Sequence, residues 1–76
     1  MRRSRGKEGE SIPSPRQLEV LRLICEGQST KQIAACLNIS HKTVAIHRFQ
    51  LLHKAKAKNS IELFRWAIKS GYVSVQ

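Results

Sequence analysis

Three stretches with the pattern of a helix N-terminus divide this chain, and they restrict its fold more than any other feature. Residues 14–17, 29–32 and 59–62 each begin with Ser or Asn and carry Gln or Glu three positions later. In such a capping box, the first side chain accepts a hydrogen bond from the backbone of the last residue, whose side chain bonds back to the first. Pro15 takes the first helical position of the first box, where its missing N–H is harmless. The spacing predicts helices that begin near residues 15, 30 and 60.

Residues that commonly end helices lie at the matching distances. Gly27 and Gly71 supply the left-handed conformation that often follows a helix. Asn38 tolerates the tight turn before Ser40, whose hydroxyl can cap a further helix. Apolar residues recur at three- and four-residue spacing, and no window alternates as a half-buried strand does. We therefore expect an all-α domain of four helices, over about residues 15–26, 30–37, 41–55 and 60–70.

The same spacing predicts which side chains form the core. The expected inward residues are Leu18, Leu21, Ile24 and Cys25 in the first helix, Ile33, Ala34 and Leu37 in the second, Val44, His47, Leu51 and Ala55 in the third, and Ile61, Phe64 and Ile68 in the fourth, with Leu63 and Trp66 beside them. Both cysteines, Cys25 and Cys36, lie in apolar helical context. We therefore expect two core thiols in a reducing compartment and not a disulfide.

Positive charge dominates the chain and is concentrated in its middle. Fourteen Lys and Arg residues oppose five Asp and Glu residues, for a formal net charge of +9. No acidic residue lies between Glu26 and Glu62, whereas that interval contains six Lys or Arg residues and all three histidines. A solvated helical face usually mixes both signs. Charge of one sign therefore favours a polyanionic partner, nucleic acid before an anionic membrane, over a merely soluble basic surface.

Several kinds of function are excluded by features that the chain lacks. Its 76 residues suffice for one small domain with little room for a catalytic cleft. His41, His47 and His53 are six residues apart, so they occupy different helical faces and lack the spacing of paired metal ligands. Without a Gly-rich phosphate loop or a catalytic grouping, we expect no enzyme, no cofactor and no metal. Without a long apolar run or a signal peptide, we expect a cytoplasmic protein with no membrane partner.

The chain divides into a polar start and a helical domain. Residues 1–11 are polar and basic, with no apolar residue after Met1. Such a composition is typical of a flexible basic arm, of a linker end, or of the trimmed edge of a longer protein. We expect residues 12–76 to form a helix-turn-helix domain, in which helix 30–37 crosses the phosphate backbone and helix 41–55 enters the major groove.

Four stretches and one histidine carry a family resemblance: residues 19–27, 29–34, 37–40 and 42–44, with His47. They closely resemble the LuxR/GerE-type (also called NarL/FixJ-type) DNA-binding domain, and the resemblance covers about residues 14–73. It implies a four-helix domain of a bacterial transcription regulator, located at the nucleoid in the cytoplasm. It also implies binding to double-stranded DNA as a homodimer, with RNA polymerase as a further partner to be considered.

The resemblance and the outward side of the third helix together define the expected interface. Base contacts are expected from Lys42, Ala45, Ile46, Phe49 and Gln50. Phosphate contacts are expected from Lys31, Thr43, Arg48, Lys54, Lys56 and Lys58. The resemblance implies a structural or phosphate-bonding role for His47. It also implies dimerisation through the fourth helix, for which the expected contacts are Leu63, Trp66 and Lys69. Trp66 is alternatively part of the core.

The sequence departs from the family pattern at positions that bear on recognition. Gln17 stands where a glutamate is usual, so a carboxylate interaction is either lost or replaced by an amide hydrogen bond. Ala45 and Phe49 stand where basic or polar residues are usual. These changes leave the predicted fold intact and alter the expected base-reading surface.

The exposed apolar pair Ile46 and Phe49 has three interpretations. The pair could contact thymine methyl groups, Phe49 could fold back against Leu52 or His53, or the pair could form a protein-docking surface. The docking interpretation makes an interaction module that no longer reads bases one rival class of protein. The other rivals are a helix-turn-helix of the sigma-factor type and an RNA-binding variant.

Overall fold

The computed structural model describes residues 12–74, and four α-helices account for most of this range. They are α2 (Pro15–Cys25), α3 (Thr30–Leu37), α4 (His41–Ala55) and α5 (Ser60–Lys69). No strand occurs within residues 12–74, which confirms the predicted all-α class. Helices α2 and α5 each end one residue earlier than expected. The predicted basic arm, residues 1–11, and the last two residues of the predicted domain lie outside the described residues.

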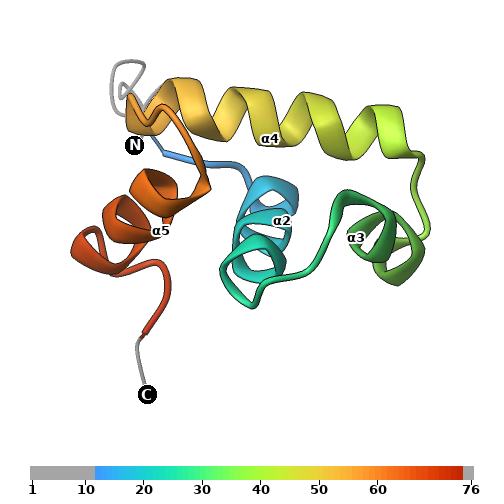
Figure 1. The fold of residues 1–76 in the computed structure, drawn as a ribbon, viewed down its shortest axis with the longest axis horizontal. Coiled ribbons are helices and arrows are strands. Elements are labelled where there is room, and N and C mark those ends of the chain that lie inside the picture. Colours follow the sequence, from blue (N-terminus) through green and yellow to red (C-terminus); the bar gives the residue numbers. More distant parts are fainter. Residues whose placement is uncertain (1–11, 75–76) are drawn as a thin grey trace, which may run out of the picture.

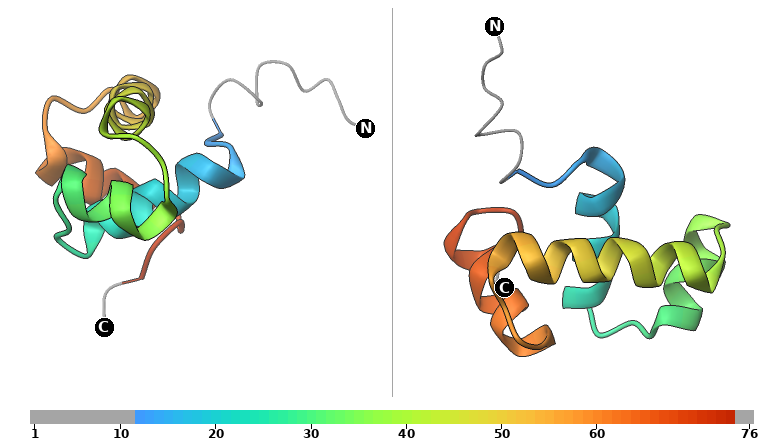
Figure 2. Two further views of the ribbon diagram at one scale, coloured as in Figure 1. Left: turned by 90° about the vertical axis from the view of Figure 1, so that its right-hand side faces the viewer. Right: turned by 90° about the horizontal axis from the view of Figure 1, so that it is seen from above.

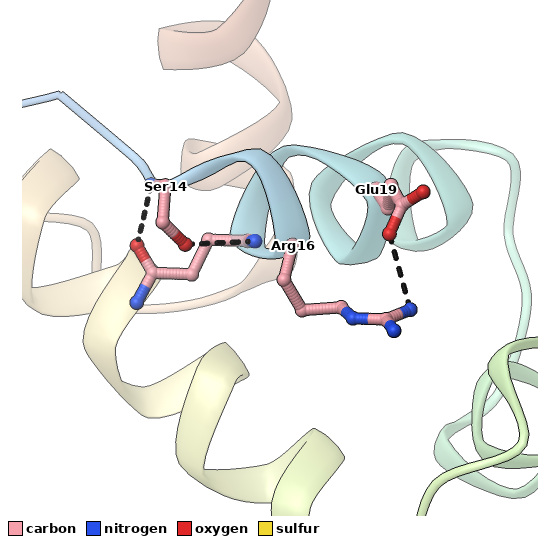
Figure 3. Close-up of polar contacts among 4 residues, drawn as sticks. Ser14, Arg16 and Glu19 are labelled. Atoms are coloured by element: carbon pink, nitrogen blue, oxygen red, sulfur yellow. Dashed lines mark hydrogen bonds and ion pairs between the residues drawn. The ribbon is translucent and has the colours of Figure 1, made fainter.

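Side-chain caps explain where the first three helices begin. The Ser14 hydroxyl accepts a hydrogen bond from the Gln17 N–H at 3.2 Å, and Gln17 Oε1 accepts one from the Ser14 N–H at 3.1 Å (Figure 3). Ser29 and Gln32 form the same reciprocal pair at 3.1 and 2.8 Å. Ser40 caps α4 with its hydroxyl. Each cap contributes about 1 kcal/mol, because it satisfies a helix N–H that has no partner within the helix.

The third predicted box forms only in part. Asn59 Oδ1 accepts a hydrogen bond from the Glu62 N–H at 2.9 Å, as expected. The Glu62 carboxylate, however, accepts from the N–H of Lys58 at 2.9 Å and not from that of Asn59. This carboxylate still lies in the first turn of α5, where the helix dipole favours negative charge.

Left-handed residues follow two of the helices directly. Asn38 (φ 57) ends α3, and Lys56 (φ 55) ends α4. Asparagine adopts this conformation readily, whereas for lysine it is uncommon because the Cβ atom crowds the following carbonyl. The turn at Lys56 is closed by the Ala57 N–H, which donates to the Leu52 carbonyl at 2.9 Å. The end of α4 is therefore set by backbone hydrogen bonds and not by a glycine.

Helix α4 crosses one side of the molecule, and the other three helices lie against its opposite side (Figure 1). Helix α3 lies near the first turn of α4, α2 lies against the middle, and α5 lies near the last turn. In the view from above, α4 runs uncovered over the other helices (Figure 2). All four helices contribute to the core, which contains Val20, Leu21, Ile24, Ile33, Ala34, Val44, Leu51, Leu63 and Ala67. Helix α4 is thus held from one side only.

The predicted buried face of α5 is wrong. Leu63 and Ala67 are completely buried, whereas Ile61 is 66% exposed. Phe64 and Ile68 are half-buried at the edge of the face. Ile61 and Leu63 are separated by roughly 200° around the helix, so both cannot face the core. The small Ala67 lies four residues after Leu63, so the two form one buried stripe.

The predicted buried face of α2 is confirmed at Leu21 and Ile24, while Leu18 and Cys25 pack at the edge of the core. Leu18 and Cys25 are half-buried, and the buried residues are Gln17, Val20, Leu21 and Ile24. The helix is therefore rotated so that a polar residue, Gln17, enters the interior. Its amide is satisfied there by hydrogen bonds, as buried polar groups generally are.

The two cysteines differ in exposure, which corrects the prediction of two core thiols. Cys25 is half-buried, Cys36 is exposed on α3, and neither forms a disulfide. Burial raises the pKa of the Cys25 thiol, and the Glu26 carboxylate raises it further. Cys25 is therefore held in the protonated, unreactive form at neutral pH.

Candidate nucleic-acid interface

The outward side of α4 carries all the residues that were predicted to read bases. Ile46 is 48% exposed and Phe49 is 71% exposed, whereas Val44 and Leu51 on the opposite side of the helix are completely buried. A single α-helix fits the major groove of B-DNA. The structure places Lys42, Ala45, Ile46, Phe49 and Gln50 together as exposed residues of this side, which we call the α4 outer face.

Phe49 stands beside a shallow hollow at the end of this face. The hollow has a volume of about 430 Å³ and is lined by Phe49, Leu52, His53, Lys56 and Ala57. Because 71% of Phe49 remains exposed, the interpretation in which it folds back against Leu52 or His53 does not describe this structure. The ring is available to contact a base or another protein.

The predicted phosphate-binding residues fall into two groups, and the first group is accessible to solvent. Lys31 is exposed in the first turn of α3, and Lys56 and Lys58 are exposed after the end of α4. Thr43 is half-buried, with its Oγ1 atom 2.9 Å from the Ser40 hydroxyl. These side chains can approach a phosphate without breaking a contact between helices.

The second group is tied to the protein itself. Lys54 Nζ donates to the carbonyl oxygen of Ile12 at 3.1 Å, and Arg48 Nη2 donates to the Ser60 hydroxyl at 2.6 Å. Lys54 and Arg48 are both half-buried. Lys54 therefore links α4 to the segment before α2, and Arg48 links α4 to the start of α5. Sequence reasoning missed both links because their partners are distant in the chain and one is a backbone carbonyl.

Gln50 lies at the edge of the α4 outer face and accepts a hydrogen bond from a buried side chain of α2. Its Oε1 atom accepts a hydrogen bond from Nε2 of the buried Gln17. Of the two outcomes expected for the missing glutamate, replacement by an amide hydrogen bond is the one observed. A buried residue of α2 is thus in direct contact with a predicted base-reading residue.

His47 is half-buried on the side of α4 that faces the protein, as predicted. Its Nδ1 atom is buried and has no hydrogen-bond partner among residues 12–74. A buried nitrogen without a hydrogen-bond partner is unfavourable.

The predicted dimerisation residues do not form one surface. Leu63 is 0% exposed and belongs to the core, so the expectation that it contacts a second subunit is wrong. Trp66 is half-buried and packs against Tyr72, with ring centroids 5.2 Å apart and an interplanar angle of 43°. Lys69 is exposed. Tyr72 follows the last helix, where no periodic pattern could have indicated its contact with Trp66.

Two further features bear on function. Within the described range, no three His, Cys, Asp or Glu side chains come together where they could hold a metal ion. None of the described helices has the length and hydropathy required to cross a bilayer.

The order of α3, the turn at residues 38–40 and α4 is that of a helix-turn-helix domain, with α4 in the place of the recognition helix. The chain matches the family described as "Bacterial regulatory proteins, luxR family" over residues 12–67. The chain belongs to this family, as the resemblance in its sequence predicted.

Curated relatives come from several bacteria. The chain is 37% identical over 60 residues to "Uncharacterized response regulatory protein YgeK" of Escherichia coli (strain K12), covering 79% of this chain and 41% of that protein. It is 41% identical over 58 residues to "Oxygen regulatory protein NreC" of Staphylococcus carnosus (strain TM300), covering 76% and 27%. It is 37% identical over 70 residues to "Transcriptional regulatory protein MctR" of Rhizobium johnstonii, covering 92% and 33%. The chain thus spans less than half the length of each of these relatives. No solved structure matches it.

Proposed function

We propose that this chain is the DNA-binding domain of a bacterial transcription regulator and that the α4 outer face reads base pairs in the major groove. Membership of the luxR family supports a role in transcription regulation, as do the names of relatives such as the transcriptional regulatory protein MctR. The observation that carries the proposal is the exposure of Ile46 and Phe49 on a helix whose opposite side is completely buried. A protein of this kind acts at the nucleoid and without a cofactor.

Electrostatic attraction would supply most of the affinity. The chain carries a net charge of +9, and lysines that neutralise phosphates release condensed counterions from DNA. We assign phosphate contacts first to the exposed Lys31, Lys56 and Lys58, with Thr43 beside them. Lys54 and Arg48 would contribute after exchanging their internal partners, or by holding α4 in place.

Dimerisation through α5 is the proposed assembly on DNA. With Leu63 in the core, the available side chains of α5 are Trp66, Lys69 and the exposed Ile61. A two-fold dimer would place two copies of α4 about 34 Å apart, one helical turn of DNA, so the preferred site would be an inverted repeat. RNA polymerase is a further proposed partner of a regulator bound in this way.

Selection of bound sites from a random duplex pool tests the proposal. The selected duplex, a random duplex and an RNA of equal length are then compared by fluorescence anisotropy over a range of salt concentrations. We expect tighter binding to the selected duplex than to either competitor, with affinity that falls steeply as salt increases. Equal affinity for all three nucleic acids would contradict sequence reading, and preference for RNA would favour an RNA-binding protein.

Substitution of Lys31 by alanine is expected to weaken binding to every duplex alike. Loss of one phosphate contact should make the log–log salt slope shallower by about 0.9, because one fewer counterion is released. Arg22→Ala is the matched control, since Arg22 is also exposed but lies in the last turn of α2, which points away from α4 (Figure 1). An unchanged slope for Lys31→Ala, or an equal change for Arg22→Ala, would remove Lys31 from the interface.

Protein docking is the second candidate function of the α4 outer face. The exposure of two large apolar side chains, Ile46 and Phe49, favours it. Absence of salt-dependent binding to any duplex would point to this function.

A further inference from the structure

A chain of hydrogen bonds connects the cap of α2 to the edge of the α4 outer face. The Ser14 N–H donates to Gln17 Oε1 at 3.1 Å, and Gln17 Nε2 donates to Gln50 Oε1. Gln17 is 6% exposed, whereas Gln50 is exposed. Figure 3 shows the hydrogen bonds between Ser14 and Gln17. It also shows the exposed Arg16–Glu19 ion pair of 3.1 Å, which is separate from the hydrogen bonds that lead to Gln50.

The direction of these hydrogen bonds is fixed, because the first donor is a backbone N–H. A glutamine amide has an oxygen that only accepts and an NH₂ group that only donates. The N–H of Ser14 therefore requires Gln17 to turn its oxygen toward the cap, which leaves the Gln17 NH₂ group pointing toward Gln50. Gln50 must in turn present its oxygen to Gln17. The remaining group of Gln50, its NH₂, is the one left for an outside partner.

We propose that Gln17 is a positioning residue that determines specificity by making Gln50 a hydrogen-bond donor toward DNA. This inference rests on the proposed function, because it assumes that the α4 outer face meets base edges. A donor matches the O6 and N7 atoms of guanine, the O4 atom of thymine and the N7 atom of adenine in the major groove, whereas cytosine presents only a donor there. The bidentate pair of glutamine with adenine needs the oxygen as well as the NH₂ group, and here the bond from Gln17 already uses one of the two lone pairs of that oxygen and holds it toward α2.

A carboxylate at position 17 would reverse the direction. Glutamate has two accepting oxygens, so it can satisfy the Ser14 N–H with one and accept from the Gln50 NH₂ group with the other. Gln50 would then rotate by half a turn about its last bond and present its oxygen outward. An outward acceptor matches the N4 amino group of cytosine or the N6 amino group of adenine. One changed atom in the interior would thus exchange the bases preferred at one position of the site.

The test compares the sites that the wild type and Gln17→Glu select from a random duplex pool. At one base position of each half-site, we expect the ratio of guanine or thymine to cytosine to fall at least about ten-fold in the variant, the effect of one good base contact. The change should vanish in the Gln50→Ala background, because no amide remains to rotate. Unchanged base preference, with or without a general loss of affinity, would overturn the inference.

Gln32→Glu is the matched control. Gln32 occupies the same position of the capping box in α3, and its Oε1 atom accepts from the Ser29 N–H at 2.8 Å. The substitution makes the same chemical change in a cap and adds the same charge, but on a residue of α3 that has no bond to α4. We expect the base preference of Gln32→Glu to equal that of the wild type. A matching shift in this control would show that added charge, and not the direction of Gln50, alters selection.

Measurements on the free protein separate this inference from the proposed function. By nuclear magnetic resonance, a scalar coupling across the hydrogen bond should join the side-chain nitrogen of Gln17 to the side-chain carbonyl carbon of Gln50 in the wild type. In Gln17→Glu the coupling should instead start from the Gln50 nitrogen. If the wild type binds no duplex, the proposed function is wrong. The direction of the Gln17–Gln50 hydrogen bond can still be measured in the free protein. If Gln17→Glu does not fold, Gln17→Met frees both groups of Gln50, and we expect the preference at that position to relax; an unrelaxed preference would overturn the inference.

Discussion

Phe49→Ala is expected to lower the preference for the selected duplex over a random duplex about ten-fold, because losing recognition of one base pair costs roughly 1–3 kcal/mol. Affinity for the random duplex should change by less than about two-fold, since no charge is removed and phosphate contacts dominate nonspecific binding. The side chain is 71% exposed, so the free energy of unfolding should change by no more than about 0.5 kcal/mol. Anisotropy titrations with both duplexes measure the two affinities.

Ile61→Ala is the control for this experiment. Ile61 is a comparably exposed apolar residue, 66% exposed, and it lies on α5 away from the α4 outer face. On a duplex with a single half-site, which binds one domain and so removes any contribution of Ile61 to a dimer contact, we expect its removal to leave the preference over a random duplex unchanged. If Phe49→Ala weakens binding to both duplexes equally, then Phe49 does not read bases, and protein docking becomes the better account of its exposure.

Leu51→Ala is expected to destabilise the fold strongly, in contrast to Phe49→Ala, although Leu51 lies only two residues from Phe49. Leu51 is completely buried at the centre of the core, where loss of a leucine side chain costs about 2–5 kcal/mol. A domain of this size is stable by about 5 kcal/mol, so the variant should keep no more than about 3 kcal/mol of stability and unfold at a much lower urea concentration than the wild type. Urea denaturation followed by circular dichroism measures the loss.

A conservative substitution distinguishes packing from chemistry at this position. Leu51→Met keeps the volume of the side chain, so it should cost less than about 1.5 kcal/mol and leave DNA binding intact. A cost below about 0.5 kcal/mol for Leu51→Ala would contradict the burial of this side of α4.

The positions of the helices could be predicted because their signals are local. Ser14, Ser29 and Ser40 cap helices within three residues of themselves, and the chain needs no distant partner to form such a cap. Helices α3 and α4 accordingly have the predicted bounds, and α2 and α5 differ by one residue. The family resemblance rests on the same local pattern and was confirmed by the match over residues 12–67.

The side chains that each helix buries could be predicted less well, because burial depends on the neighbouring helices. Periodicity alone places Ile61 and Leu63 on competing faces of α5, and packing around Ala67 selects Leu63. The same limit explains why Leu63 was expected at a subunit contact. Cys36 has apolar neighbours in the chain and is nevertheless exposed, since α3 turns that side to solvent.

The polar contacts that tie α4 to other parts of the fold could not be predicted, because they join residues far apart in the sequence. Gln17 and Gln50 are separated by 33 positions, and Lys54 and Ile12 by 42. The departure from glutamate at Gln17 was the one signal in the sequence that pointed to such a contact. The identity of its partner required the packing of α2 against α4.

The most direct measurement of the central claim is a titration of the isotope-labelled domain with the selected duplex at low ionic strength, followed by amide chemical shifts. If α4 enters the major groove, the largest shifts should lie between His41 and Ala55 and in the first turn of α3, while the last turn of α2 stays unchanged. Binding that leaves the amides of α4 in place and shifts another surface would contradict the assignment of α4 as the recognition helix.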